Sequence, residues 1–307
     1  MQSSRIRIGT RGSPLALRQA NEVRDKLIAA HGLDGDAIEI KVIATSGDAI
    51  LDKPLRDAGG KGLFAKEIEE ALLAGEIALA VHSLKDMETK LPDGLRLGCL
   101  LPREDVRDAF ISLRANSLAD LPVGAVVGTA SLRRQAQIKR LRADLEVIPF
   151  RGNVQTRLRK LEAGEADATL LAYAGLLRLG LADRATALIE TDDMLPAAGQ
   201  GAIGIELREG DGATADLVAP LNDQATEIRV TAERAFLAAL DGSCHTPIGG
   251  LAEITGDRLG LRGIVLAPDG TAWHETAREG AVSDAAQIGH EAGNELRVRA
   301  GPHFFED

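Results

Sequence analysis

The amino-acid sequence predicts an α/β protein of two lobes, followed by a small α+β domain at the C-terminal end. Apolar runs of strand length alternate with helical patterns through most of the chain. A strand turns into a capped helix in a similar way at Gly9 to Ser13 and at Gly128 to Ser131. Near the C-terminal end, Pro268-Asp269-Gly270 lies between two strand-like runs and is a strong hairpin signal.

In the first lobe, Ile77 to Val81 is an unbroken apolar run of the kind that a parallel sheet buries. The helical pattern before it closes at Gly75, and its apolar positions are Phe64, Ile68, Ala71 and Leu72. Ligands of open α/β sheets bind beyond the carboxyl ends of the strands, which is where Lys85 and Asp86 follow. A carboxylate there can exchange a proton or stabilise a cation that forms during a reaction. The alternative is a solvated ion pair in a loop.

The start of the first lobe has the features of an anion site. After the strand-like Arg5 to Gly9, Ser13 is a good N-cap and Pro14 a good first helical residue. The free backbone N–H groups of such a helix start attract an anion, and Arg11 reinforces that preference. Taken alone, the motif is only a well-capped helix. Two further strands of this lobe are expected at Ala37–Ala44 and Leu95–Leu101.

The second lobe repeats the alternation of strands and helices, with strands expected at Ala125–Gly128, Leu145–Phe150 and Ala168–Tyr173. Leu195 to Gly201 is a Pro/Gly hinge, and the strand Ala202 to Leu207 can return the chain to the first lobe. This double crossing is typical of two periplasmic-binding-protein-like (type II) lobes around a cleft. We expect domains at residues 1–101 with 200–220, at 102–199 and at 221–307.

The composition is ordinary for a globular protein. Hydrophobic residues make up 45% of the 307 positions and charged residues 27%. No apolar segment approaches the length of a membrane span, and the N-terminal residues lack the apolar region of a secretory signal. The two cysteines, Cys99 and Cys244, suggest neither a disulfide framework nor a metal cluster. We therefore expect a cytoplasmic protein with reduced thiols, no metal and no membrane partner.

The charge is unevenly distributed along the chain. The segment from Ser131 to Lys160 contains nine basic residues and two acidic ones, Asp144 and Glu146, and so carries a charge of +7. Because the net charge of the chain is −10, the other 277 residues together carry −17. The basic residues are Arg133, Arg134, Lys139, Arg140, Arg142, Arg151, Arg157, Arg159 and Lys160. A concentrated basic zone in an acidic protein indicates an anionic ligand at a defined place.

The two cysteines occur in different settings. Cys244 lies in a loop rich in glycine and proline, from Asp241 to Gly250, just after a long helical pattern. A thiol there is expected to be exposed and able to carry a covalent group. No Asn or Asp partner of a protease-like nucleophile is evident, so a tether is the better interpretation. Cys99 falls within a predicted strand and is expected to pack as a small hydrophobic residue.

Several motifs resemble those of one enzyme family and occur in the family's order. They are Thr10-Arg11-Gly12-Ser13-Pro14-Leu15-Ala16-Leu17, Gly60-Lys61-Gly62-Leu63-Phe64, Ala80-Val81-His82-Ser83-Leu84-Lys85-Asp86, Gly128-Thr129-Ala130-Ser131-Leu132-Arg133-Arg134, Arg151-Gly152-Asn153-Val154, Thr156-Arg157-Leu158, Leu195-Pro196-Ala197-Ala198-Gly199-Gln200-Gly201 and Asp241-Gly242-Ser243-Cys244-His245-Thr246-Pro247-Ile248-Gly249. From residue 9 to about residue 250, the chain resembles the porphobilinogen deaminase (hydroxymethylbilane synthase) family. Each motif is weak alone, but the set is very specific.

The resemblance implies a transferase of porphyrin and heme biosynthesis. Such an enzyme joins four porphobilinogen molecules head to tail on a dipyrromethane cofactor, with loss of ammonia at each step. A thioether to Cys244 would hold the cofactor, and hydrolysis would release the linear tetrapyrrole hydroxymethylbilane. The resemblance also implies a monomer that binds this small substrate and no nucleic acid.

The resemblance assigns roles to individual residues. Asp86 matches the catalytic carboxylate, which manages protons and stabilises positively charged pyrrole intermediates. The positions that match cofactor contacts are Lys85, Asp86, Ser131, Arg133 and Arg134. Those that match contacts to the acetate and propionate groups of the substrate are Arg11, Ser13, Arg151, Arg157 and Arg178. Lys61 and Phe64 match a mobile loop, and Gln200 matches the hinge.

Two other functions are weighed against this one. A non-catalytic bilobal protein that binds small anions would share the fold, because a fold does not determine a function, but it would leave Cys244 unexplained. Nucleic-acid binding is disfavoured because aromatic residues, which act as stacking platforms, make up only 3% of the chain. Pyrroles fit the basic segment well, since each ring brings two carboxylates and arginine binds carboxylates in a bidentate manner.

Overall fold

The computed structural model describes residues 5–49, 64–242, 246–301 and 304. The described residues form two compact units, the first from the segments up to residue 104 and 201–227, the second from 105–200 and 228–307. Each unit is considered separately below. None of the described helices is both long enough and apolar enough to cross a bilayer.

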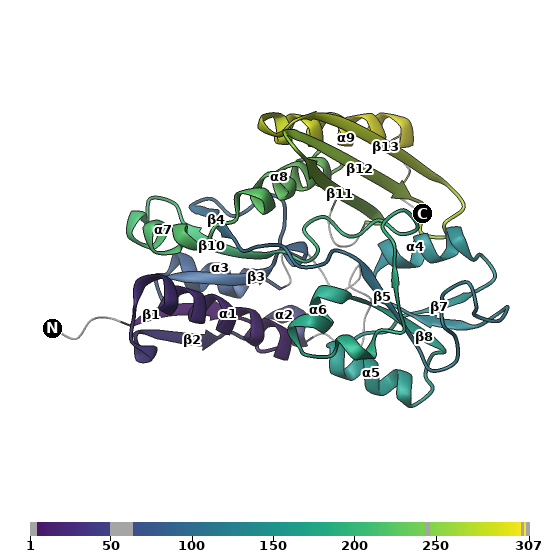
Figure 1. The fold of residues 1–307 in the computed structure, drawn as a ribbon, viewed down its shortest axis with the longest axis horizontal. Coiled ribbons are helices and arrows are strands. Elements are labelled where there is room, and N and C mark those ends of the chain that lie inside the picture. Colours follow the sequence, from purple (N-terminus) through teal and green to yellow (C-terminus); the bar gives the residue numbers. More distant parts are fainter. Residues whose placement is uncertain (1–4, 50–63, 243–245, 302–303, 305–307) are drawn as a thin grey trace. The chain divides into compact units, whose positions relative to one another are not determined.

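The first unit contains a five-stranded sheet in the order β2-β1-β3-β10-β4 (Figure 1). Its strands are β1 (Ile6–Thr10), β2 (Ile38–Val42), β3 (Leu79–Ser83), β4 (Leu95–Leu100) and β10 (Ile203–Arg208). The first three are parallel, whereas β10 runs antiparallel to both β3 and β4. The predicted return of the strand after residue 201 to this sheet is therefore confirmed.

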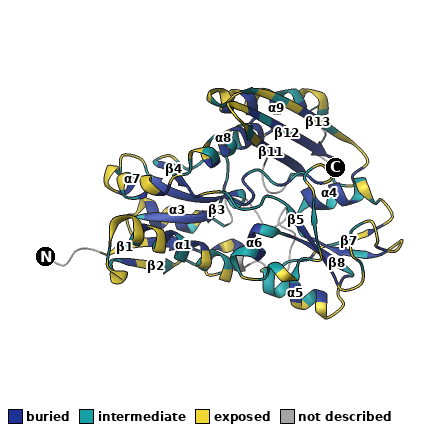
Figure 2. Ribbon diagram, in the orientation of Figure 1, coloured by how far each residue is buried: buried dark blue, intermediate teal, exposed yellow. Residues whose placement is uncertain are grey.

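Different helices cover the two faces of this sheet. Helix α1 (Pro14–His31) packs on the face that contains Ile8 and Val81, and α3 (Lys66–Leu73) packs on the opposite face over Ala80. Because side chains alternate along a strand, both faces can be apolar, and Figure 2 shows β3 as buried. The unit also contains the short helices α2 (Ser46–Ala49) and α7 (Gly212–Val218).

The strand β3 leads directly to the first predicted site residues. It starts at Leu79 rather than at the predicted Ile77, and a single 3₁₀ turn, Leu84–Asp86, follows its last residue. The backbone N–H of Leu84 donates to the carbonyl of Ala202 at 3.1 Å, which fixes the turn to the start of β10. Lys85 and Asp86 thus lie just beyond the carboxyl end of a sheet strand, as the sequence predicts.

The second unit contains a sheet of the same design, in the order β7-β6-β8-β5-β9. Its strands are β5 (Asp108–Ser112), β6 (Val126–Gly128), β7 (Glu146–Ile148), β8 (Ala168–Ala172) and β9 (Ala187–Ile189). Three are parallel, and β5 runs antiparallel to both β8 and β9. The helices are α4 (Leu132–Leu141), α5 (Val154–Glu162) and α6 (Tyr173–Arg178). The expectation of two similar α/β lobes is confirmed, although β5, β9 and α6 were not predicted.

A separate antiparallel sheet, β11-β12-β13, forms the C-terminal part of the second unit. Its strands are β11 (Ile248–Thr255), β12 (Arg258–Leu266) and β13 (Trp273–Ala281), and the helices beside it are α8 (Gln224–Ala239) and α9 (Ala285–Ala300) (Figure 1). Phe236 of α8 and Ile288 of α9 share one apolar core with this sheet. The predicted small α+β domain with its hairpin is therefore confirmed as part of the fold class.

The hairpin of the C-terminal sheet packs against α4 of the same unit. Gly270 has φ = 73°, and a Cβ atom there would lie 2.5 Å from the backbone nitrogen of Arg140, so only glycine allows this approach. The guanidinium of Arg140 lies 4.7 Å from the centre of the Trp273 ring and 2.6 Å from the carboxylate of Glu275. These contacts attach the C-terminal sheet to the helix that carries Arg133 and Arg134.

Candidate functional site

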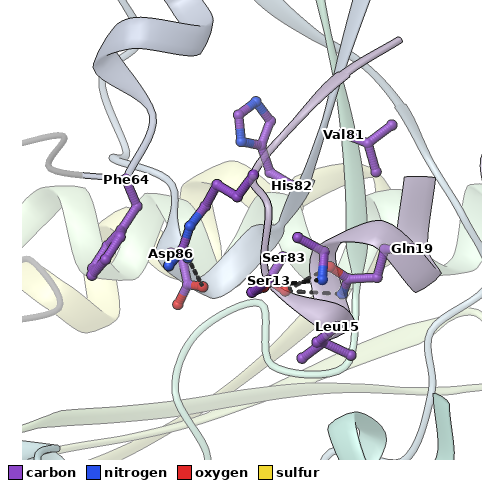
Figure 3. A pocket seen from close by; sticks show the side chains of 10 residues that line it. Ser13, Leu15, Gln19, Phe64, Val81, His82, Ser83 and Asp86 are labelled. Carbon is purple, nitrogen blue, oxygen red and sulfur yellow. Dashed lines mark hydrogen bonds and ion pairs between the residues drawn. The ribbon is translucent and has the colours of Figure 1, made fainter. Parts of the chain in front are cut away.

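A pocket in the first unit contains several of the predicted site residues. Its lining comes from the start of α1 and from the end of β3 with the turn beyond it, and comprises Arg11, Ser13, Leu15, Ala16, Gln19, Phe64, Val81, His82, Ser83 and Asp86. Figure 3 shows Asp86 and Phe64 towards one end of this pocket and Gln19 towards the other. Residues 11 and 86, far apart in sequence, meet because β1 and β3 are neighbouring parallel strands.

Arg11 connects the acidic and aromatic sides of the pocket. Its guanidinium nitrogen lies 3.8 Å from a carboxylate oxygen of Asp86, with side-chain exposures of 21% and 38%. The same guanidinium lies 4.2 Å from the centre of the Phe64 ring, a cation–π distance. The carboxylate therefore sits beside a cation and at the same time remains accessible to a ligand in the pocket.

The wall formed by α1 is held in place by its cap and by a buried glutamine. The hydroxyl of Ser13 accepts a hydrogen bond from the backbone N–H of Ala16 at 3.2 Å, so the predicted N-cap is confirmed. Gln19 is buried and its side-chain amide donates to the hydroxyl of Ser83 at 2.9 Å, which joins α1 to the end of β3. The sequence analysis missed Gln19, although a glutamine on the apolar face of a helix is the signal that could have found it.

Three buried titratable residues lie on the α3 side of the sheet. A ring nitrogen of His82 on β3 lies 3.1 Å from a carboxylate oxygen of Glu206 on β10, and both side chains are at most 5% exposed. Burial raises the pKa of Glu69 on α3 to about 7, and the negative charges of Glu206 and Glu88 add to this shift while His82 opposes it. None of these groups was predicted as a site residue, because the contacts cross between elements that are distant in sequence.

Replacing Glu69 with glutamine is expected to remove a pH dependence of stability. The folded-state pKa of Glu69, about 7, lies above the ordinary value of 4.5. The protonated carboxyl therefore makes a contribution to the free energy of unfolding that is fully present below about pH 4.5 and is lost as the pH rises through 7. Most of this loss falls between pH 5 and pH 8, where it amounts to about 2 kcal/mol of the free energy of unfolding in the wild type. Urea unfolding at pH 5 and pH 8 measures it, with the exposed Glu70→Gln variant as control. Parallel pH curves for the wild type and Glu69→Gln would contradict this expectation.

In the second unit, Arg133 and Arg134 converge on one buried carboxylate. Each guanidinium donates to a different oxygen of Asp108 at 2.8 Å, and all three residues are at most 4% exposed. Burial alone would raise the pKa of Asp108, but the charges of Arg133 and Arg134 outweigh it and hold the pKa well below its usual range. Gln200 donates to the same carboxylate at 2.8 Å. The predicted pair of arginines and the predicted hinge residue are therefore in direct contact with one group.

This cluster fits an anionic cofactor. Among the described residues, the buried Nε atoms of Arg133 and Arg134 have no hydrogen-bond partner, and a carboxylate is the natural acceptor for a guanidinium N–H. Because two guanidinium groups contact one carboxylate, that of Asp108, the three side chains together carry a net positive charge. Ser131 caps α4, since its hydroxyl accepts from the backbone N–H of Arg134. Carboxylate groups of an anionic ligand would match these donors.

The remaining predicted residues fall into three groups. Arg151, Arg157 and Arg178 belong to the second unit and are partly exposed; Arg157 donates to the carbonyl of Gly152 at 2.9 Å. Lys85 lies in the turn beside Asp86 in the first unit. Lys61 and Cys244 lie outside the described residues.

The sequence matches two family models that together cover most of the chain. Residues 6–216 match the dipyrromethane cofactor-binding domain of porphobilinogen deaminase, and residues 227–298 match the C-terminal domain of the same enzyme. A porphobilinogen deaminase of Nitrobacter hamburgensis is 64% identical over 298 residues, which cover 97% of this chain and 94% of the relative. One of Paracoccus denitrificans is 58% identical over 301 residues, covering 98% and 96%.

Among solved structures, the chain is similar to the periplasmic substrate-binding protein of an ABC transporter from Coxiella burnetii. The TM-score is 0.41 and the sequence identity 17%, over 72% of this chain and 94% of that protein. Lipoprotein Tp32 from Treponema pallidum gives a TM-score of 0.45 at 13% identity, over 73% and 92% of the two chains.

Proposed function

We propose that this chain, which belongs to the porphobilinogen deaminase family of transferases, assembles hydroxymethylbilane from four porphobilinogen molecules. The growing chain would start from a dipyrromethane that a thioether joins to Cys244. We further propose that the protein acts as a cytoplasmic monomer without nucleic-acid or membrane partners. Its three domains would follow the boundaries 1–101 with 200–220, 102–199 and 221–307.

The dipyrromethane, when bound, supplies the free pyrrole end to which the first substrate is joined. In this proposal Arg133 and Arg134 bind its carboxylates, since both have buried N–H donors without an acceptor among the described residues. Lys85 adds a cation beside the reacting end. Ser131 holds the first turn of α4, which carries both arginines. Charge-assisted hydrogen bonds of this kind contribute about 1.5–3 kcal/mol each.

Asp86 is the proposed catalytic residue. In each condensation, the bond between the methylene carbon and the amino nitrogen of porphobilinogen breaks and ammonia leaves. A carbon–carbon bond to the free pyrrole end would replace it, and the proton lost from that pyrrole carbon would pass to a base. The electron-poor substrate that remains after ammonia leaves carries positive charge, and a carboxylate nearby stabilises that charge. The same carboxylate can take up the proton that is released when the new bond has formed.

The basic residues outside the arginine pair are proposed to bind the substrate. Arg11 and Ser13 line the pocket that contains Asp86. Arg151, Arg157 and Arg178 would add charges for the acetate and propionate groups, because each new ring brings two further carboxylates. Lys61 and Phe64 are proposed to act in the loop that the family resemblance assigns to them, and Gln200 to act at the hinge.

The observation that carries the proposal is the pocket of the first unit, where the carboxylate of Asp86 lies 3.8 Å from Arg11 and is the one acidic group among the described residues of the lining. The test is the intact mass of the purified protein. It should exceed the polypeptide mass by one dipyrromethane, and limiting porphobilinogen should produce a series of equally spaced heavier species. A mass equal to the polypeptide, with no reaction even when a primer is supplied, would refute the proposal. Reversible binding of porphobilinogen without ammonia release would favour the anion-binding alternative.

A further inference from the structure

Asp108 is a fully enclosed carboxylate of the second unit that has no role in the mechanism above. It is the first residue of β5 and its exposure is 1%. One carboxylate oxygen accepts from Arg134 and from Gln200, and the other accepts from Arg133, each at 2.8 Å. Both oxygens are therefore occupied by donors that the proposed function assigns to the cofactor and the hinge.

Further contacts fix the orientation of the two guanidinium groups. Arg133 also donates to the carbonyl of Leu195 at 2.7 Å, and Arg134 donates to the carbonyl of Leu170 at 3.0 Å. The side chain of Gln137 makes two hydrogen bonds to the same residue: its amide oxygen accepts from the backbone N–H of Leu195, and its amide nitrogen donates to the carbonyl of Leu195. Each arginine is thus held by a terminal nitrogen on Asp108 and another on a backbone carbonyl. Their Nε donors are left without an acceptor within the described part of the chain.

We propose that Asp108 is a positioning residue, which orients Arg133 and Arg134 towards the carboxylates of the cofactor and ties them through Gln200 to the segment where the chain passes between its two units. This inference rests on the proposed function. Gln200 supports the connection because its amide also donates to the carbonyl of Val106 at 2.8 Å. Residues 104–105 and 200–201 are two of the points where the chain changes unit, and the third among the described residues is 227–228.

Only an aspartate suits this geometry. An asparagine has one accepting oxygen, so its amide group would face a guanidinium and leave one arginine without its partner. A glutamate keeps the charge but is longer by one methylene, which displaces both guanidinium groups in a site that has no exposed surface to absorb the change. Charge and length are therefore separable by experiment.

The first experiment compares Asp108→Glu with Asp144→Glu. Asp144 is a matched control because it lies in the same unit and also binds an arginine, Arg142, at 2.6 Å, but it has no role in the proposed function. Intact mass gives the fraction of chains that carry the cofactor, and kcat is expressed per loaded chain at a temperature below both melting points. Asp108→Glu should lower this kcat about tenfold or more with little change in KM, because the cofactor is covalently held and only its orientation is disturbed. Asp144→Glu should match the wild type.

The second experiment separates positioning from general destabilisation. Asp108→Asn, Arg134→Gln and the double variant are measured in the same way, and the double variant keeps the net charge of the wild type. If Asp108 acts through the arginines, the loss of kcat in the double variant will be smaller than the product of the two single losses. A purely structural role would lower the melting temperature and leave kcat per loaded chain unchanged.

Two results would overturn the inference alone. One is a wild-type kcat per loaded chain in Asp108→Glu, and the other is a double variant whose losses multiply. A wild-type protein that carries no added mass and shows no activity would overturn both this inference and the proposed function. The wild-type measurement therefore distinguishes the two failures.

Discussion

Replacing Asp86 with asparagine is expected to lower turnover at least about a hundredfold while the protein remains folded and loaded with cofactor. Asparagine has nearly the same size and shape, so the pocket formed by the start of α1 and the end of β3 should persist. What is lost is the negative charge beside Arg11, at 3.8 Å. Without it, the substrate cation that forms as ammonia leaves lies beside the positive guanidinium of Arg11, with no carboxylate among the described residues of the pocket lining.

Ammonia release per loaded chain, with loading taken from the intact mass, measures this effect. Glu88→Gln is a suitable control, because it removes the same charge from the same loop two positions further on and should change turnover less than about threefold. Unchanged turnover in Asp86→Asn would remove the catalytic assignment. Loss of the cofactor from Asp86→Asn would show instead that the carboxylate is needed to attach or retain the cofactor.

The features that sequence reasoning could predict are those that depend on local signals. The end of β3 followed by Lys85 and Asp86, and the Ser13 cap of α1, are set by hydrophobic runs and capping chemistry within a few residues. The hairpin turn that ends at Gly270 is a signal of the same kind, and so is the long helical pattern before the Cys244 loop, which corresponds to α8. These elements were located to within a few residues, and together they were sufficient for the fold class.

The features that it could not predict depend on pairing between distant segments. Asp108 lies beside Arg133 and Arg134 because β5 enters the second sheet next to β8, and nothing in the pattern around residue 108 specifies that register. The polar residues Pro102-Arg103-Glu104-Asp105 precede β5, and the strand after them was not predicted. Ala109-Phe110-Ile111 is nevertheless an apolar run of strand character. For the same reason the contact of His82 with Glu206 was not expected.

Replacing Cys244 with serine is expected to abolish the added mass and with it all chain assembly. A hydroxyl is far less acidic and less nucleophilic than a thiol, so no stable thioether equivalent can form. The other cysteine cannot substitute for it, because Cys99 is 2% exposed on β4 and burial raises the pKa of its thiol to about 12. A thiol in this state presents almost no thiolate at neutral pH.

The matched control is Cys99→Ala, which removes the buried thiol without placing a hydroxyl in the core. It should keep the full mass increment and the wild-type turnover, with a modest loss of stability from the deleted sulfur atom. Intact mass spectrometry of both variants, before and after incubation with porphobilinogen, gives the result directly. A mass increment that persists in Cys244→Ser and disappears in Cys99→Ala would transfer the attachment to β4, which the burial of that strand makes physically implausible without local unfolding.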